Sequence, residues 1–293
     1  MNAPGPATLR VGLVQLCSGE DPAANLAATE ALVRRAAAGG AAWALTPEVT
    51  NLVTADPDHR RAVTRPQESD PTLSRLRAVA AELGLWLLIG SLALRTDDPD
   101  GRLANRSVLI DAGGRIVATY DKIHMFDVAV DPANTHRESD AMRPGDRAVV
   151  ADCPWGRVGL SICYDMRFPA LYAALAGAGA TILTAPSAFT VPTGRAHWET
   201  LLRARAIETG SFVLAPAQSG VHPARDGAKR RETWGRSLAV SPWGEVLADA
   251  GEGEGVTLVD LDLGAAAEAR RRRRARGDAR PVAPPAAGGG GGR

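Results

Sequence analysis

Short apolar segments alternate along this chain with segments whose apolar residues recur at the period of an α-helix. The apolar run 10–16 predicts a strand, and the segment 21–38 predicts a helix with Asp21 as its N-cap and Pro22 in its first turn. A second apolar run at 43–46 completes a strand–helix–strand unit. Strands that alternate with helices in this way pack as the layers of an α/β structure.

The same alternation continues almost to the C-terminus. Further strands are predicted at 85–91, 181–185, 211–215 and 256–262, further helices at 72–83, 168–177 and 196–208, and three hairpins around Ala-Gly-Gly, Cys-Pro-Trp-Gly and Pro-Trp-Gly turns. The polar segment 121–146 lacks periodicity and predicts a long loop. Because the two halves of the chain repeat one pattern, we expect a single domain in which two sheets stack and helices cover their outer faces.

Composition limits the class of protein. Hydrophobic residues make up 45% of the 293 residues, enough for a sizeable core, yet no apolar run reaches the ~18 residues of a membrane span. The N-terminal residues lack the pattern of a secretory signal, and three cysteines are too few for a disulfide framework. We therefore expect a cytoplasmic globular protein. A net charge of +1 argues against a polycation that coats nucleic acid.

The composition changes near the C-terminus. We expect a short arm at 1–8, one folded domain at 9–263, and a tail at 264–293 that holds a run of arginines and then mostly Pro, Ala and Gly. Such a segment cannot bury a core, so the tail is predicted to be disordered. Two interpretations of its arginines stay open: a nucleic-acid-binding arm, or the solvated end of a helix followed by a frayed tail.

Cys163 is the first candidate for chemistry. It ends an apolar segment and precedes a predicted helix, and sites of α/β proteins lie at such carboxyl ends of strands. Cys17 also ends a strand, whereas Cys153 lies in a hairpin turn. On position alone, the alternative stays open that Cys163 is a small buried apolar residue, the commonest fate of a free cysteine.

Several site types lack their motifs in this chain. No histidine motif links a base to the Cys163 thiol. The sequence also has no C-x-x-C, no H-E-x-x-H, and no Gly-rich phosphate loop after a strand. We therefore expect neither a metal nor a nucleotide cofactor.

Glu48 and Lys122 also follow predicted strands. Glu48 has small or apolar neighbours in T-P-E-V-T, so desolvation is expected to raise its pKa toward that of a general base at neutral pH. Among 34 basic residues only Lys122 and Lys229 are lysines, and Lys229 lies in a polar loop. A compact ammonium approaches a developing oxyanion as a point charge, a role that suits lysine better than arginine. Ordinary surface positions are the alternative for both side chains.

Three segments, in their order along the chain, resemble the nitrilase (carbon–nitrogen hydrolase) superfamily, whose triad is Glu, Lys and Cys. They are T-P-E-V-T-N around Glu48, Y-D-K-I-H-M-F-D-V around Lys122 and C-Y-D-M-R-F-P at Cys163. The segments N-R-S-V-L-I, R-E-S-D-A-M-R-P-G-D, P-S-A-F-T, A-H-W-E-T-L-L-R-A-R-A-I-E and S-P-W-G-E-V agree as well, so the resemblance spans about 9–263. It implies an α-β-β-α sandwich, which agrees with the two stacked sheets expected above.

Within the superfamily the chain is similar to the Nit-type amidases, which act on deaminated glutathione and on ω-amides of 2-oxo acids. The resemblance implies a hydrolase of a small carboxylate-bearing amide that releases ammonia through a thioester on Cys163. It makes Glu48 the general base, Lys122 and the backbone N–H of Tyr164 the oxyanion donors, and Glu138 the second glutamate of the superfamily.

The substrate carboxylate needs a cationic or N–H-rich receiver. Arg167 and the loop from Ser187 through Phe189 to Thr193 are the candidates, with a structural ion pair as the equal alternative for Arg167. Superfamily members pair through the helices that follow the nucleophile, which implies a homodimer or larger assembly here.

The chain departs from the superfamily pattern in three places. Thr46 stands where an apolar residue is common, Arg236 stands in a G-R-S segment in place of G-H-S, and the arginine-rich tail replaces a short apolar and basic segment. Two rival functions stay open. A nitrilase or an N-carbamoyl amino acid amidohydrolase would use the same scaffold, and a non-catalytic nucleic-acid-binding protein would use the tail.

Overall fold

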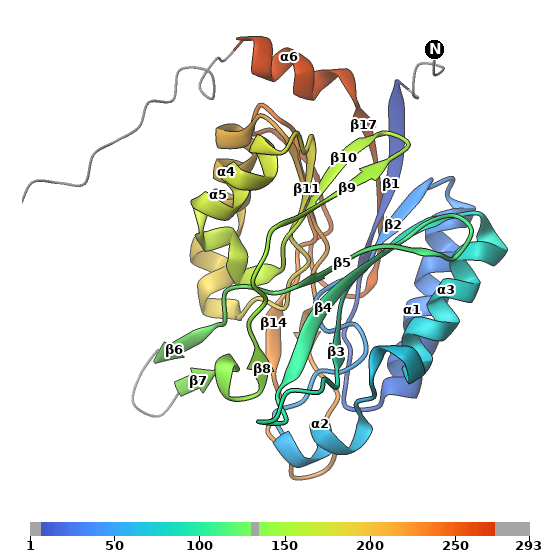
Figure 1. Ribbon diagram of the computed structural model, residues 1–293, viewed down its shortest axis with the longest axis vertical. Helices are drawn as coiled ribbons and strands as arrows, with labels where there is room; N and C mark the ends of the chain where they lie inside the picture. Colours follow the sequence, from blue (N-terminus) through green and yellow to red (C-terminus); the bar gives the residue numbers. More distant parts are fainter. Residues whose placement is uncertain (1–6, 130–134, 273–293) are drawn as a thin grey trace, which may run out of the picture.

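The computed structural model describes residues 7–129 and 135–272. In this part of the chain, two mixed β-sheets stack on each other, and helices cover the outer face of each sheet (Figure 1). The architecture is the α-β-β-α sandwich that the sequence predicts.

The first sheet is built by the N-terminal half of the chain together with the last strand. Its order is β17-β1-β2-β3-β4-β5, with β8 paired to β4. The bounds are β1 Thr8–Gln15, β2 Trp43–Leu45, β3 Trp86–Leu94, β4 Leu103–Ile110, β5 Ile116–Asp121, β8 Met142–Arg143 and β17 Gly255–Asp262. The strands β1, β2 and β3 run parallel and are covered on both faces, which explains their nearly unbroken apolar sequences.

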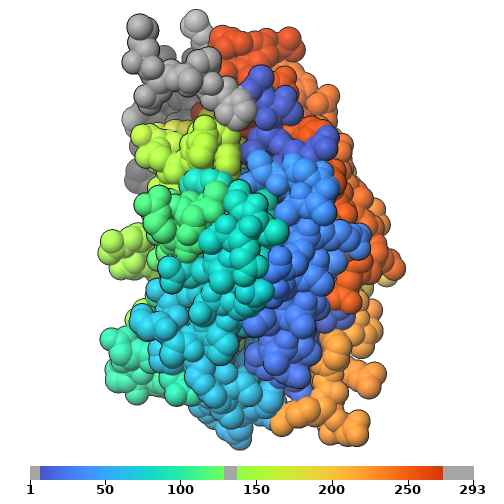
Figure 2. Space-filling view, turned by 90° about the vertical axis from the view of Figure 1, so that its right-hand side faces the viewer, coloured from blue at the N-terminus to red at the C-terminus, as the bar shows by residue number. Residues whose placement is uncertain are grey.

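Helices α1 (Pro22–Ala38) and α3 (Pro71–Leu83) cover the outer face of this sheet, and Figure 2 looks onto them in blue and cyan. Each helix begins after an aspartate, Asp21 or Asp70, whose carboxylate accepts a hydrogen bond from a first-turn N–H. A proline follows at the first helical position, where its missing N–H costs nothing. The start predicted from Asp21 and Pro22 is confirmed, and the helix predicted from periodicity at 72–83 begins one residue earlier, at Pro71.

The second sheet comes from the C-terminal half, in the order β16-β15-β12-β11-β10-β9. Its strands are β9 Val149–Cys153, β10 Gly156–Leu160, β11 Ile182–Thr184, β12 Phe212–Ala215, β15 Leu238–Val240 and β16 Val246–Asp249. Helices α4 (Pro169–Gly177) and α5 (Val191–Thr209) pack on its outer face. Between the two sheets lies an apolar core in which Trp43 of β2 packs on Trp155, with ring centroids 5.3 Å apart.

The polar segments hold elements that periodicity did not predict. These are α2 (Pro57–Val63), the 3₁₀ turns η1 (Gln67–Ser69) and η2 (Glu138–Asp140), the strands β6 (Asp127–Ala129) and β7 (Thr135–Arg137), and the hairpin of β13 (Ser219–Val221) and β14 (Glu232–Trp234). The predicted loop 121–146 is therefore only partly irregular, since β6 pairs with β7 and β8 pairs with β4. Such short pairings are set by neighbouring strands and leave no periodic signal.

The prediction of a disordered tail is wrong for residues 264–272, which form α6 (Gly264–Arg272). Ala266 and Ala269 of this helix are buried, because small side chains with high helix propensity allow close packing. Arg270 donates to the carbonyl oxygen of Ala180 at 2.5 Å and to Ser211 Oγ at 2.8 Å. Residues 1–6 and 273–293, and with them the rest of the predicted arm and tail, lie outside the described residues. Among the described helices, none has the length and apolar character needed to cross a membrane.

Candidate active site

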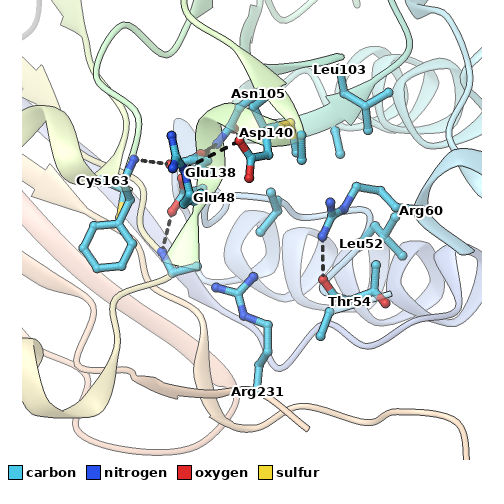
Figure 3. A pocket seen from close by; sticks show the side chains of 18 of the residues that line it. Glu48, Leu52, Thr54, Arg60, Leu103, Asn105, Glu138, Asp140, Cys163 and Arg231 are labelled. Atoms are coloured by element: carbon cyan, nitrogen blue, oxygen red, sulfur yellow. Dashed lines mark hydrogen bonds and ion pairs between the residues drawn. The ribbon is translucent and has the colours of Figure 1, made fainter. Parts of the chain in front are cut away.

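Three strand ends meet between the two sheets (Figure 3). Glu48 follows β2 and Lys122 follows β5 of the first sheet, whereas Cys163 follows β10 of the second. Lys122 Nζ lies 2.9 Å from Glu48 Oε1, and the Cys163 thiol lines the same cavity as these two groups. All three residues are buried, with relative exposures of 4%, 2% and 8% for Glu48, Lys122 and Cys163. The structure therefore brings the three predicted residues together.

Glu138, in the turn η2, contacts Lys122 as well. Its two carboxylate oxygens lie 3.0 and 2.8 Å from Lys122 Nζ, and its Oε2 accepts from the backbone N–H of Phe126 at 2.8 Å. The ammonium is thus held between two carboxylates, those of Glu48 and Glu138. If all three groups are ionised, the cluster carries one net negative charge. Without the ammonium of Lys122, two buried carboxylates would lie together without a compensating charge.

Two hydrogen-bond donors that the sequence argument missed orient Glu48. Asn105 Nδ2, on β4, donates to Glu48 Oε1 at 2.9 Å and to Glu138 Oε1 at 3.2 Å, so one amide links both carboxylates. The backbone N–H of Ala188 donates to Glu48 Oε2 at 2.8 Å. Asn105 is the first residue of the matched segment N-R-S-V-L-I, and that match could have identified it from the sequence. Ala188 acts through its backbone, so no side-chain pattern could have identified it.

The loop that carries Glu48 is braced by buried hydroxyl groups. Thr46 Oγ1 and Thr50 Oγ1 lie 2.8 Å apart, and Thr46 Oγ1 accepts from the N–H of Gly90 at 3.1 Å. A Cβ atom on Gly90 would lie 2.0 Å from the Thr46 carbonyl oxygen, so only glycine permits this close approach. Thr46, a departure from the superfamily pattern, therefore supports the loop. The other departure, Arg236, forms an ion pair with Asp249 and does not line the cavity.

Cys163 occupies a sharp turn between β10 and the 3₁₀ segment η3 (Cys163–Arg167). Its φ of +50° lies in the left-handed region, which is unusual for a residue with a side chain. Such strain persists where surrounding contacts hold it, and it is common at functional sites. The N–H of Tyr164 lies in the first turn of η3, where helical N–H groups lack a partner within the helix. It is therefore available as the predicted oxyanion donor.

Asp165 holds this turn in place and was not identified from the sequence. Its buried carboxylate accepts from the Ile162 N–H at 2.8 Å, from the Tyr120 hydroxyl at 2.7 Å and from the His124 N–H at 3.1 Å. Tyr120 lies on β5 of the first sheet and Ile162 follows β10 of the second, so the contacts of Asp165 fix the turn at Cys163 relative to the strand that precedes Lys122. The matched segments around Lys122 and Cys163 contain these residues, but their mutual contact needs the folded chain.

Burial and charge together set the protonation states. Burial by itself raises the pKa of Glu48, but the charge and hydrogen bond of Lys122, together with further hydrogen bonds such as that of Asn105, outweigh it and hold that pKa below its ordinary value. The expectation of a raised pKa is therefore wrong, because burial also brings a cation within 2.9 Å. Burial opposes the charge of Lys122, yet Glu138 and Glu48 raise the pKa of its ammonium well above the ordinary value. Burial and the charge of Glu48 raise the pKa of the Cys163 thiol. The resting site thus holds a carboxylate, an ammonium and a thiol.

The triad opens into a cavity of about 860 Å³, within the usual range for sites that bind small molecules. Three of the residues predicted to contact the substrate or its oxyanion, Tyr164, Phe189 and Thr193, line it. Ser187 and Arg167 do not line it. The Ser187 hydroxyl is buried and donates to the Ala185 carbonyl oxygen at 2.9 Å.

Arg167 serves a packing role in place of the expected substrate contact. Its guanidinium lies over the rings of Tyr164 and Phe189, 5.7 and 5.5 Å from their centroids, and 3.2 Å from His197 Nδ1. The arginines that do line the cavity, Arg60 and Arg231 among them, come from segments in which periodicity predicted no element. Within the described ranges, no group of three His, Cys, Asp or Glu side chains is arranged to hold a metal ion.

The chain is similar in sequence and in fold to known carbon-nitrogen hydrolases. The sequence model of the family described as carbon-nitrogen hydrolase matches residues 10–271. The deaminated glutathione amidase of Yersinia enterocolitica is 42% identical over 238 residues, 81% of each chain. The crystal structure of the C. elegans NitFhit protein superposes with a TM-score of 0.85 at 31% identity, over 94% of this chain and 66% of that one. A mutant amidase from Nesterenkonia sp. AN1, with the acetamide moiety of fluoroacetamide covalently added at its active-site cysteine, gives a TM-score of 0.73 at 26% identity, over 95% of this chain and 100% of that one.

Proposed function

Since the chain belongs to the carbon–nitrogen hydrolase family, we propose that it hydrolyses the amide bond of a small carboxylate-bearing substrate at Cys163. One observation carries this proposal: the carboxylate of Glu48, buried 2.9 Å from the ammonium of Lys122, lines the same cavity as the buried thiol of Cys163. A base, a nucleophile and an electrophilic donor are thereby present in one cavity, as covalent acyl transfer requires.

In the acylation half, Glu48 accepts the thiol proton of Cys163 while the sulfur attacks the carbonyl carbon. A free thiolate does not accumulate, because the pKa of the thiol is raised by burial and by the charge of Glu48. The oxyanion is stabilised by the Lys122 ammonium and the Tyr164 N–H. When the tetrahedral intermediate collapses, the carbon–nitrogen bond breaks and the nitrogen takes the proton from Glu48, leaving a thioester.

In the deacylation half, the same carboxylate serves again. Glu48 accepts a proton from water while the water oxygen attacks the thioester carbon, and the same two donors stabilise the oxyanion. The carbon–sulfur bond then breaks, and the sulfur of Cys163 regains its proton from Glu48. Glu138 positions the ammonium of Lys122 throughout, at 2.8 and 3.0 Å.

The name of the Yersinia relative and the size of the cavity support deaminated glutathione as the substrate. This compound is the 2-oxoglutaryl amide of cysteinylglycine, so its hydrolysis yields 2-oxoglutarate and cysteinylglycine. Ammonia, the leaving group expected from the sequence, is released only from primary amides such as 2-oxoglutaramate. Both compounds place the same acyl group on Cys163.

A substrate panel tests the proposal. Purified protein is given deaminated glutathione, 2-oxoglutaramate, an N-carbamoyl amino acid and an aliphatic nitrile, and 2-oxoglutarate, ammonia and carbon dioxide are measured. We expect 2-oxoglutarate from the first two and no carbon dioxide. Cys163→Ala should abolish turnover, whereas Cys153→Ala should retain it because that thiol ends β9 and does not line the cavity. Turnover of the nitrile or the carbamoyl compound alone would establish the rival functions.

Two further expectations stay predictions. Self-association, implied by the superfamily resemblance, should appear as a dimer or larger species in light scattering. A cytoplasmic location should appear in cell fractionation. The nucleic-acid hypothesis also stays a prediction: Arg270 binds protein groups, whereas Arg271 and Arg272 are exposed and pair with Glu268 of the same helix.

A further inference from the structure

Two arginines line the cavity across from Cys163 and lack a carboxylate partner (Figure 3). Arg60 belongs to α2, and Arg231 directly precedes β14. Arg60 donates a side-chain hydrogen bond to the carbonyl oxygen of Thr54 at 3.0 Å. In the part of the chain that the structure describes, neither guanidinium forms an ion pair with Asp or Glu. Both side chains are half-buried, so their charge is only partly solvated.

Arg225, on the same hairpin as Arg231, differs from these two arginines because it does pair with carboxylates. Its guanidinium pairs with Glu20 at 3.1 Å and with Asp56 at 2.6 Å. Asp56 also caps α2, so these pairs hold the β13–β14 hairpin against the start of that helix. The two segments that carry Arg60 and Arg231 are therefore fixed to each other by contacts in which neither of these guanidiniums forms an ion pair, although Asp56 and Glu138 act on Arg60 at longer range.

The electrostatics of the pair favour an anion. Burial, followed by the positive charges of Arg231 and Arg61, lowers the pKa of Arg60, and the smaller opposing effects of Asp56 and Glu138 do not restore it. Two like charges held together in a partly desolvated wall are unfavourable until an anion lies between them. A guanidinium matches the planar geometry of a carboxylate with two parallel hydrogen bonds, which suits it to that anion.

The position of Arg60 and Arg231 in the cavity indicates which half of the substrate they face. The acyl half becomes bonded to Cys163, so it must stay beside Lys122 and Tyr164. The arginines lie on the opposite wall, formed by α2 and the hairpin, in a cavity of about 860 Å³ that is large for a five-carbon acyl group alone. The space toward these arginines is therefore left for the leaving amine.

We propose that Arg60 and Arg231 bind a carboxylate on the leaving-amine half of the substrate, so that the enzyme selects amides of acidic, peptide-like amines over primary amides. This inference rests on the proposed function, because it assumes amide hydrolysis at Cys163. It assigns to the two arginines the discrimination between deaminated glutathione, whose amine half ends in a carboxylate, and 2-oxoglutaramate, whose amine half is ammonia.

The test compares these two substrates, which share one acyl group, in the parent protein and in Arg60→Gln and Arg231→Gln. Each variant should raise KM for deaminated glutathione about ten- to hundredfold, the loss expected for a hydrogen bond to a charged group, with kcat nearly unchanged. For 2-oxoglutaramate, kcat/KM should stay close to the parental value. Deaminated glutathione with its glycine carboxylate converted to an amide should be a poor substrate for the parent and insensitive to both variants.

Arg147→Gln is the matched control, since Arg147 is exposed and contacts only its neighbour Asp146. An equal loss on both substrates would overturn the inference, because the arginines would then act on the acyl half or on the fold. Unchanged kinetics on both would overturn it as well. If Arg60→Gln fails to fold, Arg231→Gln decides the matter. Failure of the proposed function is distinct, since the parent would then hydrolyse neither substrate.

Discussion

Replacing Lys122 by methionine removes the positive charge from the buried cluster while keeping a long side chain. At the observed 2.9 Å and an effective permittivity of about 20, the Lys122–Glu48 pair attracts by about 6 kcal/mol before desolvation is counted. Without the cation, the carboxylates of Glu48 and Glu138 face each other with only Asn105 between them. Lys122→Met therefore changes both the donor set of the oxyanion and the protonation of the base.

The two losses have different signatures. Removing one oxyanion donor costs about 3–4 kcal/mol in the transition state, or about 10²–10³ in kcat. Removing the charge also ends the effect that holds the pKa of Glu48 below its ordinary value, so burial and Glu138 raise it. In the parent, Glu48 is ionised through the neutral range, which places the acid limb of kcat/KM at low pH. In Lys122→Met this limb should move to higher pH, so the deficit should be largest in mild acid.

The assay is steady-state release of 2-oxoglutarate from deaminated glutathione across the mildly acidic to alkaline range, with circular dichroism to verify folding. Lys229→Met is the matched control and should keep the parental kcat, because Lys229 is exposed at the cavity rim. Breaking a buried ion pair destabilises by about 3–5 kcal/mol, so Lys122→Met could unfold. Lys122→Arg then decides: it keeps the charge and the low acid limb but should lose turnover. Near-parental kcat with an unmoved acid limb would refute the role of Lys122.

Four other outcomes follow from the structure. Gly90→Ala should lower the free energy of unfolding by at least about 1–3 kcal/mol in urea titration, because the new Cβ would lie 2.0 Å from the Thr46 carbonyl oxygen. Asp165→Asn should lower the free energy of unfolding by about 1–3 kcal/mol in the same measurement. It should also reduce kcat, because it weakens the hydrogen bonds that hold the turn at Cys163. Burial lowers the pKa of His222 from 6.5 to about 4, so below its ordinary pKa the unfolded chain binds a proton that the folded chain does not. Stability should therefore fall by about 2 kcal/mol from pH 7 to pH 5, and His222→Gln should flatten this dependence in urea titrations at both pH values. Ending the chain after Arg272 should leave Tm unchanged, whereas removal of α6 as well should lower it, since α6 buries apolar surface.

Several features could be predicted because they depend on neighbouring residues. The starts of α1 and α3 follow from an aspartate and a proline in sequence, and β1 to β3 follow from apolar runs covered on both faces. Glu48, Lys122 and Cys163 were identified because each follows a strand within a matched segment. Their roles could be proposed without knowing how far apart the three residues lie in the folded chain.

Other features depend on partners that are distant in the sequence. Arg167 and Ser187 are plausible substrate contacts in the chain, but one packs on aromatic rings and the other satisfies a buried carbonyl group. Arg60 and Arg231 lie in segments without periodicity, and only the hairpin's contact with α2 places both in the cavity wall. A helix end was one interpretation of the arginine run, but the bounds and burial of α6 were not predicted, because its packing relies on small side chains that a polar and alanine-rich composition does not reveal.

The sequence by itself therefore determined the layered α/β class, and it identified the strand ends and the three residues that we propose as the triad, since periodicity and motif order are properties of consecutive residues. Only the tertiary structure decided the charge state of that triad. Lys122 lies 74 residues beyond Glu48 in the chain and 2.9 Å from it in space. A pKa depends on burial and on the distance to other charges. From its neighbours in the sequence, Glu48 is expected to have a pKa raised by desolvation, whereas beside Lys122 its pKa is lowered and its carboxylate is ionised.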